Sequence, residues 1–272
     1  MEGIALPTRE IQHFRNAARV IFHDPRKKGE NGITHGGNST KVKEYNPRTA
    51  RRLGLHLSEF GHLYSKEITL TWPKEFPMDG LVVREKRLKM LRKLKTYGVE
   101  EYTHALEFQE RGAPHIHILV DKYVDLKWLA SSWYKIVGSE DPKHLKAGTE
   151  INEIRDMTRT RIYMCSYAKK KDQKELPEGY TECGRFWDSN RSVKPHEVEV
   201  CEYDDTRHMN RESRNITRWR KAVKRAVQKS TGKKYKAWKI ENGKGFLAWG
   251  ENNIIRHTLD RLKPQPDSEI PF

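Results

Sequence analysis

Apolar and polar residues alternate along four short stretches of the chain, and a period of two predicts β-strands. These stretches are rich in β-branched and aromatic residues and cover residues 66–73, 101–109, 115–121 and 147–155. Between and after them, apolar residues recur at helical spacing and predict helices over residues 78–98, 125–138 and 158–171. Strands and helices mixed in this way predict the α+β class.

The order of these elements is strand, helix, strand, strand, helix, strand, and then a further helix. The first six spell the split βαβ, or ferredoxin-like, pattern. We therefore predict an antiparallel sheet with helices on one face and a functional site on the other.

The two ends of the chain carry weaker patterns. Residues 1–20 predict a short amphipathic helix, and residues 24–48, rich in Gly, Asn and charge, predict a mobile loop. Two further strands are predicted at 183–191 and 196–203. Residues 204–232 predict a long basic helix with a break in it.

These patterns predict three consecutive parts. They are an N-terminal helix with its loop (1–48), a central α+β domain (49–203) and a basic helical C-terminal extension (204–272). A length of 272 residues accommodates one large domain with extensions.

The charge of the chain indicates the class of its partner. Lys plus Arg outnumber Asp plus Glu by 53 to 37, which gives a formal net charge of +16. A field of that sign favours a polyanion such as nucleic acid, although a merely basic protein is the alternative.

The lack of a recognisable targeting signal, together with the cysteine spacing, indicates a compartment. The three cysteines have no CxxC spacing, no apolar run approaches the roughly 20 residues of a membrane span, and the N-terminus lacks the apolar core of a signal peptide. We therefore predict no membrane association and a location in the cytoplasm, or in the cytoplasm of a host cell.

The segment GAPHIHILV places His115 and His117 one residue apart on a strand, so both imidazoles point to one face. A hairpin that sets Gln109 opposite His115 would put Glu107 opposite His117. Two imidazoles and a carboxylate suit a divalent metal ion. The alternative is a chance pair of histidines on a half-buried strand.

The helix over 158–171 contains RIYMCSYAKKK, in which Tyr163 and Tyr167 are four residues apart and share one face. Lys170 follows three residues after Tyr167. A phenol with a pKa near 10 is a poor nucleophile unless a nearby lysine and a polarised phosphate assist it. The alternative is that both tyrosines pack against the sheet and the lysines are solvated.

Together these motifs resemble the HUH superfamily of rolling-circle replication initiators, the Rep endonucleases of phages, viruses and small plasmids. ITLTWP resembles the first motif, EFQERGAPHIHILV the metal-binding second motif, and YAKK the YxxK of the third, in the family's order over roughly residues 64–191. The doubled YMCSYAKK is similar to the two-tyrosine arrangement of phage initiators. The residue three after Tyr163 is Ser166 rather than lysine, which departs from that arrangement.

The resemblance implies a role for each residue. His115, His117 and Glu107 would hold Mg²⁺ or Mn²⁺, Tyr167 would attack the scissile phosphate, and Lys170 would assist, with Tyr163 as a second tyrosine. The product would be a 5′-phosphotyrosine and a free 3′-OH, and the same site could rejoin the ends. The implied partners are single-stranded DNA at a replication origin, a host helicase and a polymerase.

Other readings use the same residues differently. A single-strand transposase or a mobilisation relaxase would share the chemistry, although relaxases usually place the tyrosine before the histidines. A metallohydrolase would cut with water and form no covalent adduct. A non-catalytic nucleic-acid-binding module would not cut, although the aromatic stacking signature of RRM-like sheets is not evident.

The basic helix within 204–232 is the candidate for contacts with duplex origin DNA. Its cations crowd two to three turns, while Ile216, Trp219, Ala222 and Val223 offer an apolar side. The alternative is the solvated face of a packing helix.

Overall fold

A computed structural model describes most of the chain, namely residues 6–23, 47–166, 177, 179–180, 182–203, 206–232, 238–239 and 245–262. The chain divides into two compact units. Residues 35–193 form one, and residues 1–34 together with 194–272 form the other. In the part of the chain that is described, no helix is both long enough and apolar enough to span a membrane.

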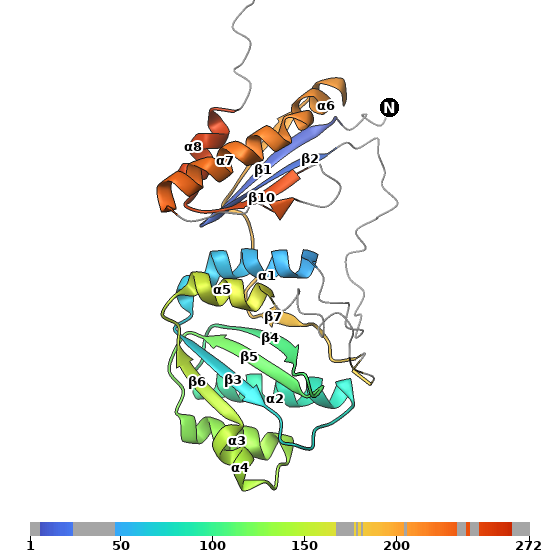
Figure 1. Ribbon diagram of the computed structural model, residues 1–272, viewed down its shortest axis with the longest axis vertical. Coiled ribbons are helices and arrows are strands. Elements are labelled where there is room, and N and C mark those ends of the chain that lie inside the picture. The colour runs from blue at the N-terminus through green and yellow to red at the C-terminus, as the bar shows by residue number, and fades with distance from the viewer. Residues whose placement is uncertain are drawn as a thin grey trace, which may run out of the picture. The chain divides into compact units, whose positions relative to one another are not determined.

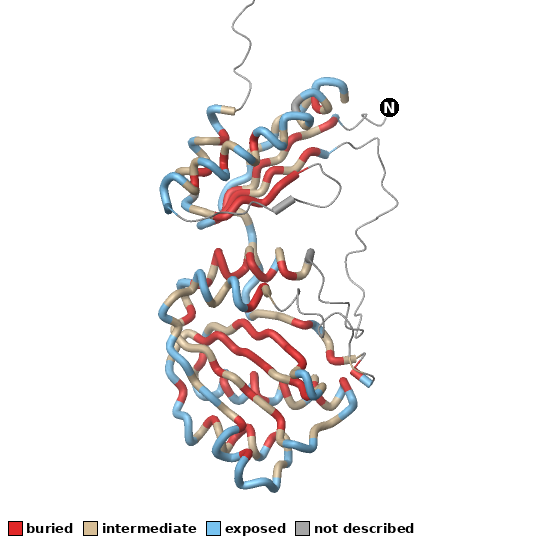
Figure 2. The backbone as a smooth tube through the Cα atoms, in the orientation of Figure 1, coloured by how far each residue is buried: buried red, intermediate tan, exposed pale blue. Residues whose placement is uncertain are grey.

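The unit of residues 35–193 is built on a five-stranded antiparallel sheet with the strand order β6-β3-β5-β4-β7 (Figure 1). Its strands are β3 (Lys66–Thr71), β4 (Tyr102–Phe108), β5 (Pro114–Val120), β6 (Thr149–Glu153) and β7 (Trp187–Ser189). The central strands β4 and β5 are almost wholly buried, as the red tube shows in Figure 2, whereas β3 alternates between buried and half-buried residues along its C-terminal half.

Three helices lie against one face of this sheet (Figure 1). They are α2 (Gly80–Tyr97), α3 (Leu126–Val137) and α4 (Pro142–Ala147). The carboxylate of Asp79 caps α2 by accepting from the Leu81 N–H, and Asp125 caps α3 in the same way. Trp133 of α3 donates its indole N–H to the Thr71 carbonyl at 2.7 Å, which ties α3 to the end of β3.

Two helices lie on the opposite face, α1 (Pro47–Phe60) and α5 (Met157–Ser166) (Figure 1). A one-turn 3₁₀ helix, η1 (Gly61–Leu63), follows α1. His56 of α1 lies 2.7 Å from the Thr103 hydroxyl of β4 and 3.1 Å from the Tyr64 hydroxyl, so a buried polar network joins α1 to the sheet. Because α1 covers part of the site face, the prediction of helices on one face only was incomplete.

The predicted α+β class and the predicted succession of elements in this unit are confirmed. The ferredoxin-like assignment itself stays a prediction. The third predicted helix is described as far as Ser166, and residues 167–171 lie outside the described residues. The predicted loop over 24–48 also lies outside them, except that α1 begins at Pro47.

The other unit has a second antiparallel sheet, with the order β8-β1-β2-β10-β9. Its strands are β1 (Thr8–Phe14), β2 (Ala17–His23), β8 (Glu197–Glu202), β9 (Trp238–Lys239) and β10 (Gly245–Trp249). The helices α6 (Thr206–Arg214), α7 (Ile216–Thr231) and α8 (Asn252–Asp260) close its core. The predicted break in the basic helix is confirmed at Asn215, between α6 and α7.

The prediction of an N-terminal amphipathic helix is wrong, because residues 8–23 form the hairpin of β1 and β2. Burial in β1 follows a period of two, with Arg9, Ile11 and His13 buried in turn. Those three side chains face the helices, and β1 is hydrogen-bonded on both sides. The N-terminal segment and the C-terminal residues therefore belong to one unit, where three consecutive parts were expected.

Candidate metal and tyrosine site

The β4–β5 hairpin decides which side chains meet. Glu107 pairs with His115, and Ala105 pairs with His117. The prediction that Glu107 stands directly opposite His117 is therefore wrong by two residues. A slip of two residues keeps every side chain on its face, so the three residues still share one side of the sheet. The turn is closed by Gln109 and Ala113 around Gly112, whose φ of +79° favours glycine.

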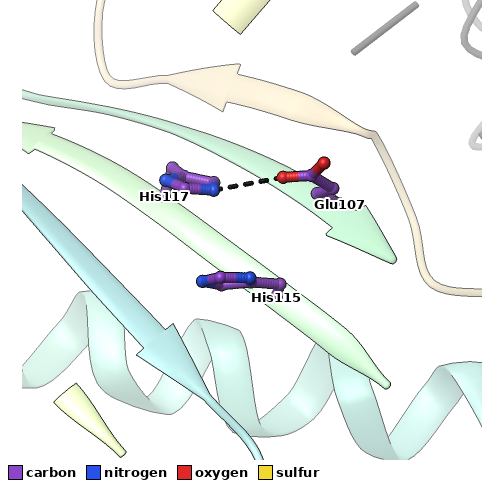
Figure 3. A group of neighbouring side chains, drawn as sticks. All are labelled: Glu107, His115 and His117. Atoms are coloured by element: carbon purple, nitrogen blue, oxygen red, sulfur yellow. Dashed lines mark hydrogen bonds and ion pairs between the residues drawn. The ribbon is translucent and has the colours of Figure 1, made fainter. Parts of the chain in front are cut away.

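Glu107, His115 and His117 form one compact cluster (Figure 3). Each offers a ligand atom, and these atoms all lie within 4.8 Å of one another. His117 Nε2 is 3.3 Å from Glu107 Oε2, and the two imidazoles stack with centroids 4.8 Å apart. Glu107 and His117 are buried, whereas His115 is half-buried. The structure thus brings together all three residues predicted to bind a metal.

A fourth residue, Glu67 of β3, holds the far side of the His117 ring. Its Oε1 lies 3.0 Å from His117 Nδ1. A carboxylate accepts but does not donate, so Nδ1 carries the proton and donates to Glu67. Nε2 faces Glu107 at 3.3 Å, so it is the nitrogen that would bind a metal ion in place of a proton. Sequence reasoning missed Glu67, because its contact depends on the pairing of β3 with β5, which sets Thr69 opposite His117 and Glu67 two residues along the same face.

The pKa of His117 is raised above its ordinary value. Burial alone would lower it, but hydrogen bonds and charge contacts with Glu107 and Glu67 outweigh the burial. The buried carboxylate of Glu107 and the half-buried carboxylate of Glu67 make the surroundings of this imidazole negative, which favours a bound cation.

The donor set fits a divalent metal ion. One carboxylate and two imidazoles supply oxygen and nitrogen ligands, and three protein ligands leave coordination positions for substrate and water. A metal-bound imidazole that donates its other N–H to a carboxylate is a frequent arrangement, and Glu67 provides that carboxylate for His117.

The His115 ring is braced from the hairpin turn. Its Nδ1 lies 3.3 Å from Gln109 Nε2, and Gln109 Oε1 accepts from Arg111 Nε at 3.0 Å. Arg111 also donates to the carbonyls of Trp72, Pro73 and Lys74. One guanidinium therefore joins the loop after β3 to the hairpin that carries the histidines.

Tyr163 of α5 stands over this cluster. Its ring meets the His117 ring edge to face, with centroids 5.8 Å apart and planes at 87°. Tyr163 is 46% exposed, so its ring is accessible to solvent. The Asp156 side chain caps α5 by accepting from the Thr158 and Arg159 N–H groups, which fixes where the helix begins.

Tyr167 and Lys170, the predicted nucleophile and its supporting lysine, lie outside the described residues. Of the residues expected at the site, the structure therefore joins Tyr163, Glu107, His115 and His117.

The chain matches no protein-family model, and no curated protein matches it significantly.

Proposed function

We propose that this protein is a metal-dependent DNA-nicking and strand-transfer enzyme that uses a tyrosine nucleophile, and that it initiates rolling-circle replication. The observation that carries the proposal is the edge-on contact of Tyr163 with His117, a member of the Glu107, His115 and His117 cluster. A tyrosine beside side chains that can hold a metal ion supplies a nucleophile and a means of withdrawing charge from a phosphate, which together support phosphoryl transfer to a phenol.

The reaction follows from these groups. The phenolic oxygen bonds to phosphorus, the bond from phosphorus to the 3′ oxygen breaks, and that oxygen takes up a proton as a free 3′-OH. The phenol loses its proton. The tyrosine stays joined, through a phosphodiester, to the 5′ end of the DNA strand downstream of the nick. A divalent cation held by Glu107, His115 and His117 would withdraw charge from the non-bridging phosphoryl oxygens. Because the bond energy is retained, attack by a 3′-OH reverses the step.

Two tyrosines are candidates for the attacking group. The YxxK context favours Tyr167 with help from Lys170, whereas the contact with His117 favours Tyr163. We propose that Tyr167 is the main nucleophile, assisted by Lys170, and that Tyr163 acts as a second tyrosine at the site.

The substrate proposed is single-stranded DNA at a replication origin, with a host helicase and polymerase acting on the free 3′-OH. The formal net charge of +16 supports a polyanionic substrate. We place this activity in the cytoplasm, or in the cytoplasm of a host cell.

The test is incubation with labelled single-stranded origin DNA and Mn²⁺, followed by a denaturing gel and peptide mapping of the adduct. We expect a covalent complex that chelator prevents, with the phosphate on Tyr163 or Tyr167. Tyr163→Phe and Tyr167→Phe made singly assign the attack, and the double variant should form no adduct. Adduct on another residue, or cleavage without any adduct, would contradict the proposal, and the second outcome would indicate a water nucleophile.

A further inference from the structure

Helix α7, in the unit formed by the two ends of the chain, has two sharply different faces. Trp219, Val223 and Val227 are buried in the core of that unit. The same helix carries six Lys and Arg residues and no Asp or Glu. One face of such a helix packs in the core, and the opposite face contacts solvent or a partner.

Four of the six cations form what we term the basic stripe: Arg218, Lys221, Arg225 and Lys229. They are spaced three, four and four residues apart, which places them along one side of a helix, opposite the buried residues. All four are exposed. Within the described part of the chain, none of the four forms an ion pair.

The basic stripe rests on a fixed support. The Trp219 ring packs against Phe22 of β2, with centroids 6.4 Å apart, and the Arg9 guanidinium of β1 lies 5.4 Å from the same ring. Both contacts come from the N-terminal hairpin, so the hairpin sets the orientation of α7. The helix backbone that carries the stripe is therefore held in place before any partner binds.

We infer that the basic stripe binds the phosphate backbone of duplex DNA. Its length, from Arg218 to Lys229, is about 16 Å at the helical rise, which corresponds to about five base-pair steps of a duplex. Charge complementarity is direct, because the stripe presents four cations and α7 carries no carboxylate. Binding would depend on phosphates and not on base sequence.

Other polyanions fit this surface less well. Sites for single strands stack bases on exposed aromatic rings, whereas Trp219, the aromatic residue of α7, is 3% exposed. A helix lying on a membrane inserts its apolar face, but the apolar face of α7 is already buried in the core. The inference goes beyond the proposed nicking reaction, since it concerns another unit and requires no metal.

The test compares two triple variants of the full chain, each removing two lysines and one arginine. In the stripe variant, Lys221, Arg225 and Lys229 become Gln. In the control variant, Lys89, Arg92 and Lys95 of α2, which are also exposed, become Gln. Affinity for a short duplex of mixed sequence is measured in chelator over a range of salt concentrations, with a single-stranded oligonucleotide as a second probe.

We expect the stripe variant to lose duplex affinity and to show a slope of log K against log salt shallower by about 2.7, which is about 0.9 for each lost phosphate contact. The control variant should keep a slope close to that of the unchanged protein. Equal losses in both variants would show that net charge alone binds duplex and would overturn the inference. A loss confined to the single-stranded probe would also overturn it. Because chelator is present, failure of the nicking proposal leaves this result unaffected.

Discussion

His117 has a carboxylate at each ring nitrogen, Glu67 at Nδ1 and Glu107 at Nε2. Their roles differ because Glu107 belongs to the cluster of ligand atoms, while Glu67 faces the nitrogen that points away from Glu107. One residue would bind the ion, and the other would set the tautomer of the ring that binds it.

The first prediction concerns the substitution of His117, one of the three candidate metal ligands. His117→Ala takes one nitrogen from the three-residue set, so Mn²⁺ affinity and adduct formation should both be lost. Binding to single-stranded DNA in chelator should stay nearly unchanged, because phosphate contacts come mainly from Lys and Arg. Isothermal titration with Mn²⁺ measures the first effect, and full adduct formation by the variant in chelator would contradict the metal site.

Glu67 provides a finer test of the same ring. Glu67→Gln keeps the size of the side chain but removes the charged acceptor, so we expect Mn²⁺ affinity to fall by roughly 10-fold to 100-fold. Glu85→Gln, an equal charge change on the exposed side of α2, serves as the control. The idea fails if both variants bind Mn²⁺ as the unchanged protein does.

At the scale of elements, α1 is attached to the sheet through a histidine that must stay neutral. Burial lowers the pKa of His56 from 6.5 to about 4. The neutral ring meets the hydroxyls of Thr103 and Tyr64 within hydrogen-bonding distance. Protonation would place an uncompensated charge between α1 and β4.

The pH dependence follows from that lowered pKa. Between pH 6.5 and about 4 the unfolded chain binds a proton at His56 that the folded chain does not, so stability falls as the pH falls. The loss attributable to His56 is on the order of 3 kcal/mol once the pH is below the folded pKa. Urea unfolding of the protein and of His56→Gln at pH 7 and pH 5 measures it. The variant should be less stable at pH 7 but less sensitive to pH, and an equal pH sensitivity would rule out His56 as the source.

The elements of the sheet around the site could be predicted because each forms from local pattern. The alternation in GAPHIHILV predicted that His115 and His117 share a face. The predicted hairpin register was wrong by two residues, but Glu107 still lies on the same face as the two histidines. Glu67 could not be assigned in this way, since its contact depends on β3 lying beside β5. Likewise, the helical pattern read over 1–20 gave no information that β1 would pair with β8, almost 190 residues later in the chain.

At the scale of the whole molecule, the chain builds two hydrophobic cores from interleaved stretches of sequence. The N-terminal hairpin and residues 194–272 belong to one unit, and residues 35–193 form the other unit between them in the sequence. Ile11 of β1 lies in the core shared with α7 and α8, whereas Ile116 of β5 lies beneath the histidines of the other unit, and both are fully buried. Formation of the first core therefore requires contacts of high sequence separation.

Matched truncations in the two cores should separate the two units. Ile11→Ala and Ile116→Ala each remove the same atoms from a site with no solvent exposure, and each should cost about 2–5 kcal/mol. We expect Ile11→Ala to speed amide hydrogen exchange in α7 while Mn²⁺ affinity stays unchanged. Ile116→Ala should speed exchange in β4 and β5 and weaken Mn²⁺ binding, with α7 still protected. If either substitution loosened both units equally, the two cores would unfold as one, and the duplex-binding surface could not be separated from the metal site.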